Sequence, residues 1–253
     1  MALHGSGARP GADPPEGRDG SGPIEFARPD LHRDNRKGIP EVLLAQGKRH
    51  EDVLSIARRF IDGTGRSIIS RVDGDLLGKL RLEFSDCDLQ EHSPSRMVVV
   101  KRHGFELPRT GGMIGVISAG TSDVPVAEEA RVVAEEMGCE AIAVYDVGVA
   151  GIHRLFQPLQ ALREASVDAI IVAAGMDGAL PSVVSGLVDV PVIGLPTSVG
   201  YGYGGQGVAA LMSMLQTCSP GLTVVNIDNG VGAGATAALI ANRMAKARMK
   251  ELG

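Results

Sequence analysis

The residues best suited to chemistry in this 253-residue chain are short polar segments that each follow an apolar run. Ser122 and Asp123 stand just before Pro125. Proline is favoured at the first position of a helix, where free backbone amides attract anions. The pair therefore suits a phosphate site, but serine and aspartate equally often cap a helix without binding a ligand. A P-loop lysine and a Gly-x-Gly-x-x-Gly motif are missing from this segment, which argues against the usual P-loop and dinucleotide folds.

His153 is the only histidine between residues 110 and 253, and Arg154 follows it directly. Histidine titrates near neutral pH and can act as a general acid or base, here beside a cation that could bind an anion. A lone histidine is more often a surface residue or a helix-start residue. The sequence leaves both interpretations open.

Residues 196–207 contain five glycines and two of the three tyrosines of the chain, with hydroxyl groups from Thr197 and Ser198. A segment this rich in glycine is longer and more adaptable than a turn requires. It is typical of a flexible flap over a ligand. A contact between subunits would also explain it.

The three cysteines are far apart and form neither a disulfide framework nor a zinc motif. Cys218 follows a predicted helix, and a helix C-terminus disfavours a thiolate, so nothing local activates it. From the residues alone we expect Cys218 to be a buried core thiol, like Cys139. Cys87 lies between two aspartates and is expected to be inert.

The elements that must position these segments form two regions. After Arg109, five apolar runs alternate with four helical stretches and a fifth helical stretch closes the chain, which predicts a parallel sheet covered on both faces, a doubly wound α/β domain over residues 110–253. Its ligands are expected at the carboxyl ends of the strands. The strands are expected at 114–118, 141–145, 169–174, 190–195 and 223–227, and the helices at 125–137, 155–165, 180–187, 206–217 and 234–250.

The first 109 residues differ from the rest of the chain in composition. Residues 1–23 hold almost nothing apolar and are expected to be a disordered tail. Residues 24–109 are charged and mixed, with a helical pattern at 51–61 and strand-like runs at 67–72 and 97–101, so we expect a small α+β domain. This first part carries 18 basic and 17 acidic residues, whereas residues 110–253 carry 7 and 13.

Composition excludes several function classes. The net charge of −5 and the aromatic content of 3%, with no tryptophan, argue against a nucleic-acid partner. No run of 18 apolar residues and no apolar leader are present, so a cytoplasmic protein without a membrane partner is expected. The α/β region has no lysine before Lys246, so an anionic ligand would also need cations from the first domain or a neighbouring subunit, such as Arg36, Lys48 and Arg71.

Residues 113–245 resemble the PurE family of carboxyaminoimidazole ribonucleotide mutases and carboxylases. The resemblance rests on residues 115–123, the loop 146–154, the segment 191–196 and the alanine-rich last helix. It implies a flavodoxin-like, five-stranded parallel sheet. It also implies a symmetric oligomer, a homo-octamer, with sites shared between subunits.

A longer stretch, from about Phe26 to Met244, resembles the LarB family of nickel-pincer nucleotide cofactor biosynthesis. The Arg-x-Gly-x-Pro-Glu segment that begins at Arg36 has no counterpart in the purine enzymes. The motifs that carry this resemblance are residues 30–42, Gly47-Lys48, Ser70-Arg71, 118–123, 148–154, 175–181, the tyrosine–glycine flap and Leu215-Gln216-Thr217-Cys218.

The LarB resemblance implies a reaction. Family members carboxylate the pyridinium ring of nicotinic acid adenine dinucleotide with CO2 and cleave its phosphoanhydride, giving pyridinium-3,5-biscarboxylic acid mononucleotide and AMP. A cysteine adds to the ring, and Cys218 stands at the expected position. A cationic pyridinium resists electrophiles, whereas thiolate addition makes an electron-rich dihydropyridine that attacks CO2. Loss of the ring proton and of the thiolate then restores aromaticity.

The same resemblance suggests roles for the other polar segments. Thr121, Ser122 and Asp123 would hold the ribose phosphate, and Cys218, His153 and Asp123 would be catalytic. Asp146 and Asp177 are candidate ligands of a Mg2+ ion for anhydride cleavage. Further substrate contacts are expected from Gly151, Arg154, Gly175, Met176, Thr197, Ser198, Gly200, Tyr201, Arg36, Lys48 and Arg71.

Two alternatives compete with this interpretation. A PurE-type carboxylase or mutase would act on an aminoimidazole ribonucleotide, which is already an electron-rich enamine and needs no thiol. A nucleotide-sensing module would bind phosphate at the Ser-Asp loop without turnover, because one fold hosts many functions.

Overall fold

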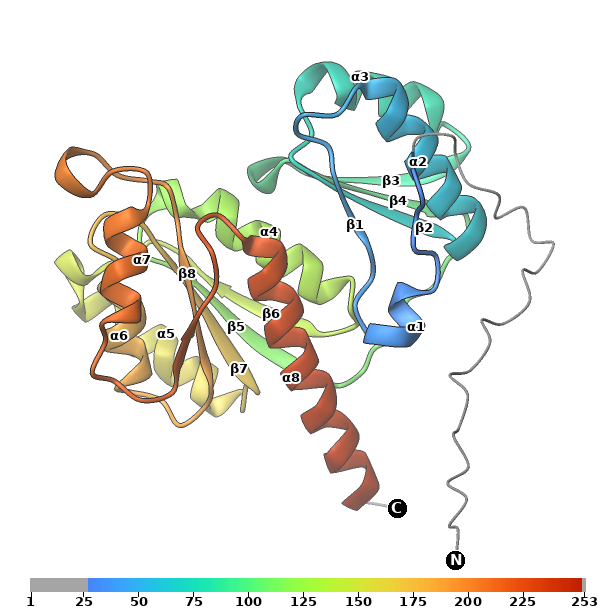
Figure 1. Ribbon diagram of the computed structural model, residues 1–253. Coiled ribbons are helices and arrows are strands. Elements are labelled where there is room, and N and C mark those ends of the chain that lie inside the picture. Colours follow the sequence, from blue (N-terminus) through green and yellow to red (C-terminus); the bar gives the residue numbers. More distant parts are fainter. Residues whose placement is uncertain (1–26, 252–253) are drawn as a thin grey trace, which may run out of the picture.

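The computed structural model describes residues 27–251 as two sheets that pack against opposite sides of one pair of helices (Figure 1). The tail expected at residues 1–23 lies outside the described residues. None of the described helices is both long enough and apolar enough to cross a membrane.

The larger sheet contains five parallel strands in the order β6-β5-β7-β8-β9, the flavodoxin-like doubly wound order that was predicted. The central strands β7 and β8 are buried over their whole length because they are apolar throughout and helices cover both faces. The strands are β5 (Met113–Ser118), β6 (Glu140–Val144), β7 (Ala169–Ala174), β8 (Val192–Pro196) and β9 (Leu222–Val224).

Two layers of helices cover this sheet. One layer contains α4 (Val124–Glu135) and α8 (Gly230–Glu251), and the other contains α5 (His153–Glu164), α6 (Leu180–Ser185) and α7 (Val208–Leu215). Short 3-10 turns precede three of them: η2 (Thr121–Asp123), η3 (Val149–Gly151) and η4 (Gly202–Gly204). The helix α8 approaches α4 very closely, since a Cβ on Gly234 would lie 2.3 Å from the carbonyl oxygen of Ala130.

The smaller sheet has the order β1-β2-β4-β3 and forms an α+β unit with three helices. Strands β1 and β2 are parallel, and the other two pairs are antiparallel. The sequence did not reveal β3, because its residues alternate between half-buried and exposed. The elements are α1 (Arg33–Lys37), β1 (Val42–Leu44), α2 (His50–Thr64), β2 (Arg66–Ser70), α3 (Gly74–Glu83), β3 (Cys87–His92), η1 (Ser93–Ser95) and β4 (Met97–Arg102).

The two units share a core. Ile68 and Val99 of the small sheet belong to the same buried cluster as Ala130 of α4 and Ala237 of α8. The opposite face of the small sheet packs against α2 and α3 through a separate cluster that includes Phe60 and Leu80. The small sheet is therefore a third layer over α4 and α8.

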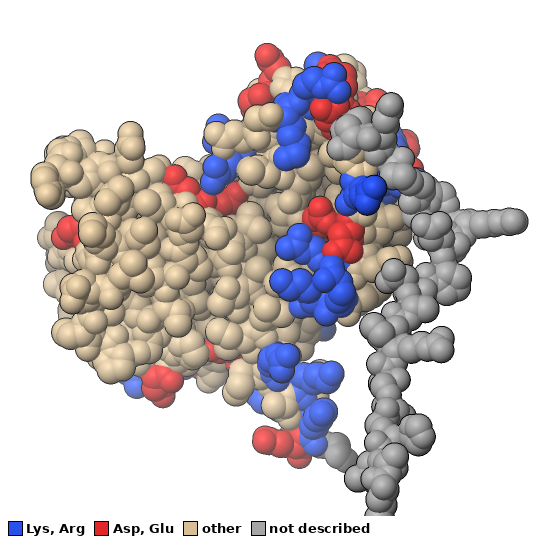
Figure 2. Space-filling model, viewed as in Figure 1, with Lys and Arg blue, Asp and Glu red and all other residues tan. Residues whose placement is uncertain are grey.

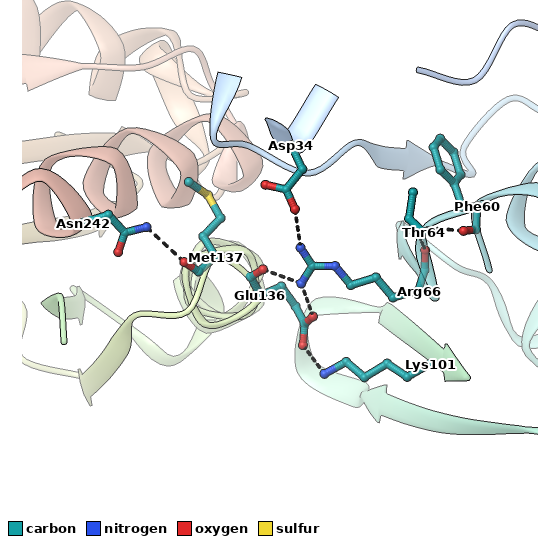
Figure 3. Close-up of polar contacts among 8 residues, drawn as sticks. All are labelled: Asp34, Phe60, Thr64, Arg66, Lys101, Glu136, Met137 and Asn242. Carbon is teal, nitrogen blue, oxygen red and sulfur yellow. Dashed lines mark hydrogen bonds and ion pairs between the residues drawn. The ribbon is translucent and has the colours of Figure 1, made fainter. Parts of the chain in front are cut away.

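A buried ionic cluster at the end of α4 reinforces this contact (Figure 3). Both Arg66 and Glu136 are less than a tenth exposed, and the Nη1 of Arg66 lies 2.9 Å from Oε2 of Glu136 and 2.5 Å from its carbonyl oxygen. Lys101 contacts the other carboxylate oxygen at 2.6 Å, and Asp34 contacts the Nη2 of Arg66 at 3.1 Å. The cluster joins β2, β4 and α1 to the C-terminal end of α4.

Replacing Arg66→Met should destabilise the chain by about 1–3 kcal/mol, because the buried carbonyl and carboxylate of Glu136 lose a charged donor while Lys101 still pairs with the carboxylate. Chemical denaturation would measure the change. Arg81→Met is the matched control, since Arg81 forms an exposed pair with Glu91 and its loss should hardly move the unfolding midpoint. Equal shifts for both variants would contradict the assigned role of Arg66.

Candidate functional site

A cavity of about 550 Å3 lies at the carboxyl ends of the parallel strands, where the loops after β5, β6, β7 and β8 meet. Five of the nucleotide contacts and both metal ligands suggested by the sequence line it. They are Thr121, Ser122, Asp123, Asp146, Gly175, Met176 and Asp177. We call this the strand-end cavity.

Asp123 is the residue around which the first and fourth loops are fixed. The amide of Gly120 donates to its Oδ2 at 2.9 Å, and the hydroxyl of Thr197 donates to its Oδ1 at 2.6 Å. Asp123 is 4% exposed and Thr197 is fully buried. Both carboxylate oxygens therefore have donors within the protein, and the hydroxyls of Thr121 and Ser122 remain exposed at the start of α4.

Close backbone approach shapes the walls of the cavity. A Cβ on Gly175 would lie 2.2 Å from the carbonyl oxygen of Val199, and one on Gly148 would lie 2.8 Å from that of Ala119. Met176, whose φ is 52°, donates its amide to the Val199 carbonyl at 2.8 Å and leaves its side chain half exposed. The glycines of these loops thus let four chain segments meet around one space.

His153 and Arg154 begin α5 beside the cavity but are not among its lining residues. The side chain of His153 is exposed, and its imidazole makes no hydrogen bond within the described part of the chain. Arg154 pairs with Asp146 at 2.8 Å and packs over Gly151. In this arrangement Arg154 holds a carboxylate of the neighbouring loop.

The candidate metal ligands do not form a metal site by themselves. Asp146 is already paired with Arg154, and Asp177 accepts the amide of Ala179 at 3.4 Å. No group of three metal-ligating side chains occurs among residues 27–251. Substrate phosphates would have to supply the remaining ligands, so Mg2+ stays a prediction and we derive no chemical step from it.

The other expected contacts do not lie together. Ser198 and Arg71 line a second cavity, next to the first, whereas Tyr201 is exposed beyond both. Gly200 packs against Met176 at the rim. Arg36 pairs with Asp30, and Lys48 donates to the carbonyl of Leu44 at 2.7 Å, so these two cations are held away from both cavities.

The burial predicted for Cys218 from its residues alone was wrong, because the thiol is exposed. The helix α7 runs from the carboxyl edge of the sheet back to its amino edge, and Cys218 lies in the loop there, before Leu222 pairs with Val192, the first residue of β8. The nucleophile candidate and the strand-end cavity are therefore at opposite edges of one sheet.

The other two cysteines differ from Cys218 in their surroundings. Cys139 is buried, as expected, and desolvation raises its pKa to about 11. Cys87 is partly buried, and burial together with Asp86 raises the pKa of its thiol. Of the three thiols, Cys218 is thus the one that is exposed.

Sequence reasoning missed Gln46, Arg96, Glu129 and Asp228, which line the second cavity. Asp228 directly follows the fifth predicted strand, a position at which ligand-binding residues are expected, so its place was a usable signal. Arg96 lies in the turn between β3 and β4, 26 residues before Ser122, and nothing local marks it.

Comparison with known proteins gives matches over both units. Residues 113–253 match the AIR carboxylase family, and residues 22–102 match the LarB/PurE-like N-terminal domain. An uncharacterized protein of Methanocaldococcus jannaschii is 43% identical over 86% of this chain and 84% of its own length. The N5-carboxyaminoimidazole ribonucleotide mutases of Thermotoga maritima and Mycobacterium tuberculosis are 31% and 32% identical, over 50% and 55% of this chain and 73% and 76% of theirs.

Replacing Thr197→Val should destabilise the chain by about 1–3 kcal/mol, since it leaves a buried oxygen of Asp123 without a donor. Thermal or chemical unfolding would measure this. Thr223→Val is a suitable control, because Thr223 is exposed and its hydroxyl makes only a long contact of 3.4 Å. If both variants unfold alike, Thr197 does not fix the first loop to the fourth.

Proposed function

Because the chain belongs to the LarB family, in which a LarB/PurE-like N-terminal domain precedes an AIR carboxylase domain, we propose that it carboxylates and hydrolyses nicotinic acid adenine dinucleotide. The products are pyridinium-3,5-biscarboxylic acid mononucleotide and AMP, and CO2 is the co-substrate. The AIR carboxylase match by itself supports a carboxylase-related activity. The observation that carries the finer proposal is the exposed thiol of Cys218, which an aminoimidazole substrate does not need.

The strand-end cavity suits the nicotinate nucleotide. Thr121 and Ser122 line the cavity in the turn that leads into α4, at the positive end of the helix dipole, and their exposed hydroxyls would bind the ribose phosphate. Asp123 would act by holding this loop in place, because both of its carboxylate oxygens already have donors. The scarcity of cations in this domain is compatible with a phosphate bound by amides and hydroxyls.

The ring chemistry needs a thiolate. The sulfur of Cys218 bonds to a ring carbon and neutralises the pyridinium, and the electron-rich dihydropyridine then attacks CO2 through carbon. A base takes the ring proton, the carbon–sulfur bond breaks, and the thiolate and the aromatic ring are recovered. His153, exposed beside the cavity, is our candidate for this base.

A thiol at the amino edge can meet a ring at the carboxyl edge only if the two belong to different subunits. The exposed face of α7 supports such an arrangement, because Val208, Met212 and Leu215 are all more than half exposed, as are Tyr201 and Tyr203 of the flap. Figure 2 shows few charged side chains over this part of the molecule. We propose that this surface packs against another copy in a homo-oligomer, an octamer as in our sequence-based expectation.

Incubation of the protein with the dinucleotide, 13C-bicarbonate and Mg2+ should give AMP and a mononucleotide carrying one labelled carboxylate, detected by mass spectrometry. Cys218→Ser should lower carboxylation on the order of a thousandfold or more. Cys87→Ser is the control and should retain activity.

Unchanged dinucleotide, with turnover of an aminoimidazole ribonucleotide instead, would replace this proposal by the purine-type reaction. Binding of nucleotides without turnover of either substrate would favour the sensing module.

Mixing two inactive variants tests whether the site is shared. Cys218→Ser lacks the thiol, and Ser122→Asp places a negative charge at an exposed position of the phosphate loop. Subunits exchanged at equal amounts should recover about a quarter of the wild-type activity if the two residues of one site come from different copies. Each variant assembled alone is the control. No recovery after verified exchange would place both residues of a site in one chain.

A further inference from the structure

A second cavity, of about 370 Å3, lies where the two units meet, and we call it the junction cavity. It shares Ser122 and Val199 with the strand-end cavity, so the two spaces lie on either side of these residues. Both volumes fall within the range of about 300–1,000 Å3 that is usual for small-molecule sites. The remaining lining residues are Gln46, Arg71, Ser95, Arg96, Pro125, Val126, Glu129, Ser198 and Asp228.

Two arginines of the small unit bring positive charge to the junction cavity. Arg71 donates to Oε1 of Gln46 at 2.8 Å and to the carbonyl oxygen of Asp228 at 2.9 Å. A guanidinium has five N–H donors, so three remain after these two contacts. Because its contacts come from both units, Arg71 is held in place in the lining of the cavity.

Arg96 is the less constrained cation. Its backbone adopts a left-handed conformation with φ of 52°, fixed by a hydrogen bond from the amide of Val72 at 2.9 Å. Its side chain is exposed, and within residues 27–251 its guanidinium has no hydrogen bond and no ion pair. A left-handed backbone is uncommon for arginine. Here it places the unpaired guanidinium of Arg96 in the lining of the junction cavity, together with Arg71.

The two carboxylates in the same lining have their own partners. Oδ1 of Asp228 accepts the amide of Ser198 at 2.8 Å. Glu129 accepts the hydroxyl of Ser70 and the first amides of α8, and burial raises the pKa of its carboxyl. Neither acid is paired with Arg96. An anion that enters the cavity therefore meets two arginines with unused donors.

The start of α4 adds a third feature that favours an anion. Pro125 and Val126 of its first turn line the junction cavity, Thr121 lines the strand-end cavity, and Ser122 lines both. The positive N-terminal end of α4 thus lies next to both the junction cavity and the strand-end cavity. Two phosphates joined by a single oxygen would bind on the two sides of Ser122.

We propose, resting on the proposed function, that the junction cavity binds the adenylate half of the dinucleotide, with its phosphate on Arg71 and Arg96. The nicotinate half occupies the strand-end cavity. In the hydrolysis, water forms a bond to the phosphorus of the nicotinate half, and the bond from that phosphorus to the bridging oxygen breaks. The electron pair stays on the departing AMP phosphate, the protons of water go to solvent, and the arginines stabilise the charge that develops. The small unit is thereby the part that selects a dinucleotide.

Calorimetry on the full chain tests this with AMP and nicotinic acid mononucleotide as separate probes. Arg96→Gln should weaken AMP binding at least about tenfold and raise the KM for the dinucleotide, with unchanged affinity for the mononucleotide. Arg96→Lys, which keeps the charge, should recover part of the loss. Arg81→Gln removes an arginine of the same unit that is paired elsewhere and is the control.

The outcomes separate this proposal from the proposed function. If the wild-type protein turns over the dinucleotide but Arg96→Gln changes neither AMP affinity nor KM, the junction cavity is not the adenylate site. Absence of AMP binding by the wild-type protein at millimolar concentration overturns it as well. If AMP binds through Arg96 but the dinucleotide is not carboxylated, the cavity assignment holds and the proposed reaction fails.

Discussion

The contact between α4 and the small sheet is the constraint on which the rest of the structure depends. Arg66 binds the carbonyl and the carboxylate of Glu136 at the C-terminal end of α4, where a cation complements the helix dipole. Halfway along, Glu129 accepts the hydroxyl of Ser70, and at the N-terminal end the Thr121–Asp123 turn faces the strand-end cavity. One helix therefore carries the anion-binding turn at one end and the anchor to the second unit at the other. A shift of the small sheet along α4 would move Arg71 relative to Ser122.

Because the parallel sheet offers few cations, the cavity depends on backbone geometry. The Gly175 and Gly148 loops approach other backbones so closely that a Cβ would clash, and the fixed Asp123–Thr197 hydrogen bond holds the first loop against the fourth. A site lined by amides and hydroxyls gives weak electrostatic attraction by itself. The arginines of the small unit supply that attraction from one side, which gives a physical reason for the two units to be joined in one chain.

The local sequence pattern was enough to predict the strands of the parallel sheet, but it did not predict β3 or the position of Arg96. The run from Ala169 to Ala174 is apolar at every position, and only a strand covered on both faces fits it in six residues. By contrast, β3 is an edge strand with mixed polarity, so its pairing with β4 decides its structure and no local pattern does. Arg96 entered the junction cavity through a left-handed turn in the other unit, and this contact depends on packing over long sequence distances. The expected fifth strand also ended early, at Val224, because the chain leaves the edge of the sheet there.

Cys218 shows why residue type and local position do not determine exposure. A cysteine after an amphipathic helix packs inward or faces outward according to where the following strand joins the sheet. Here β9 starts only at Leu222, so residues 216–221 form a surface loop at the amino edge. The same crossover that exposes the thiol separates it from the strand-end cavity of its own chain. If the thiol reacts with a ring bound at that cavity, then catalysis requires association, and the apolar side chains on α7 that are exposed in one chain have a reason to be there.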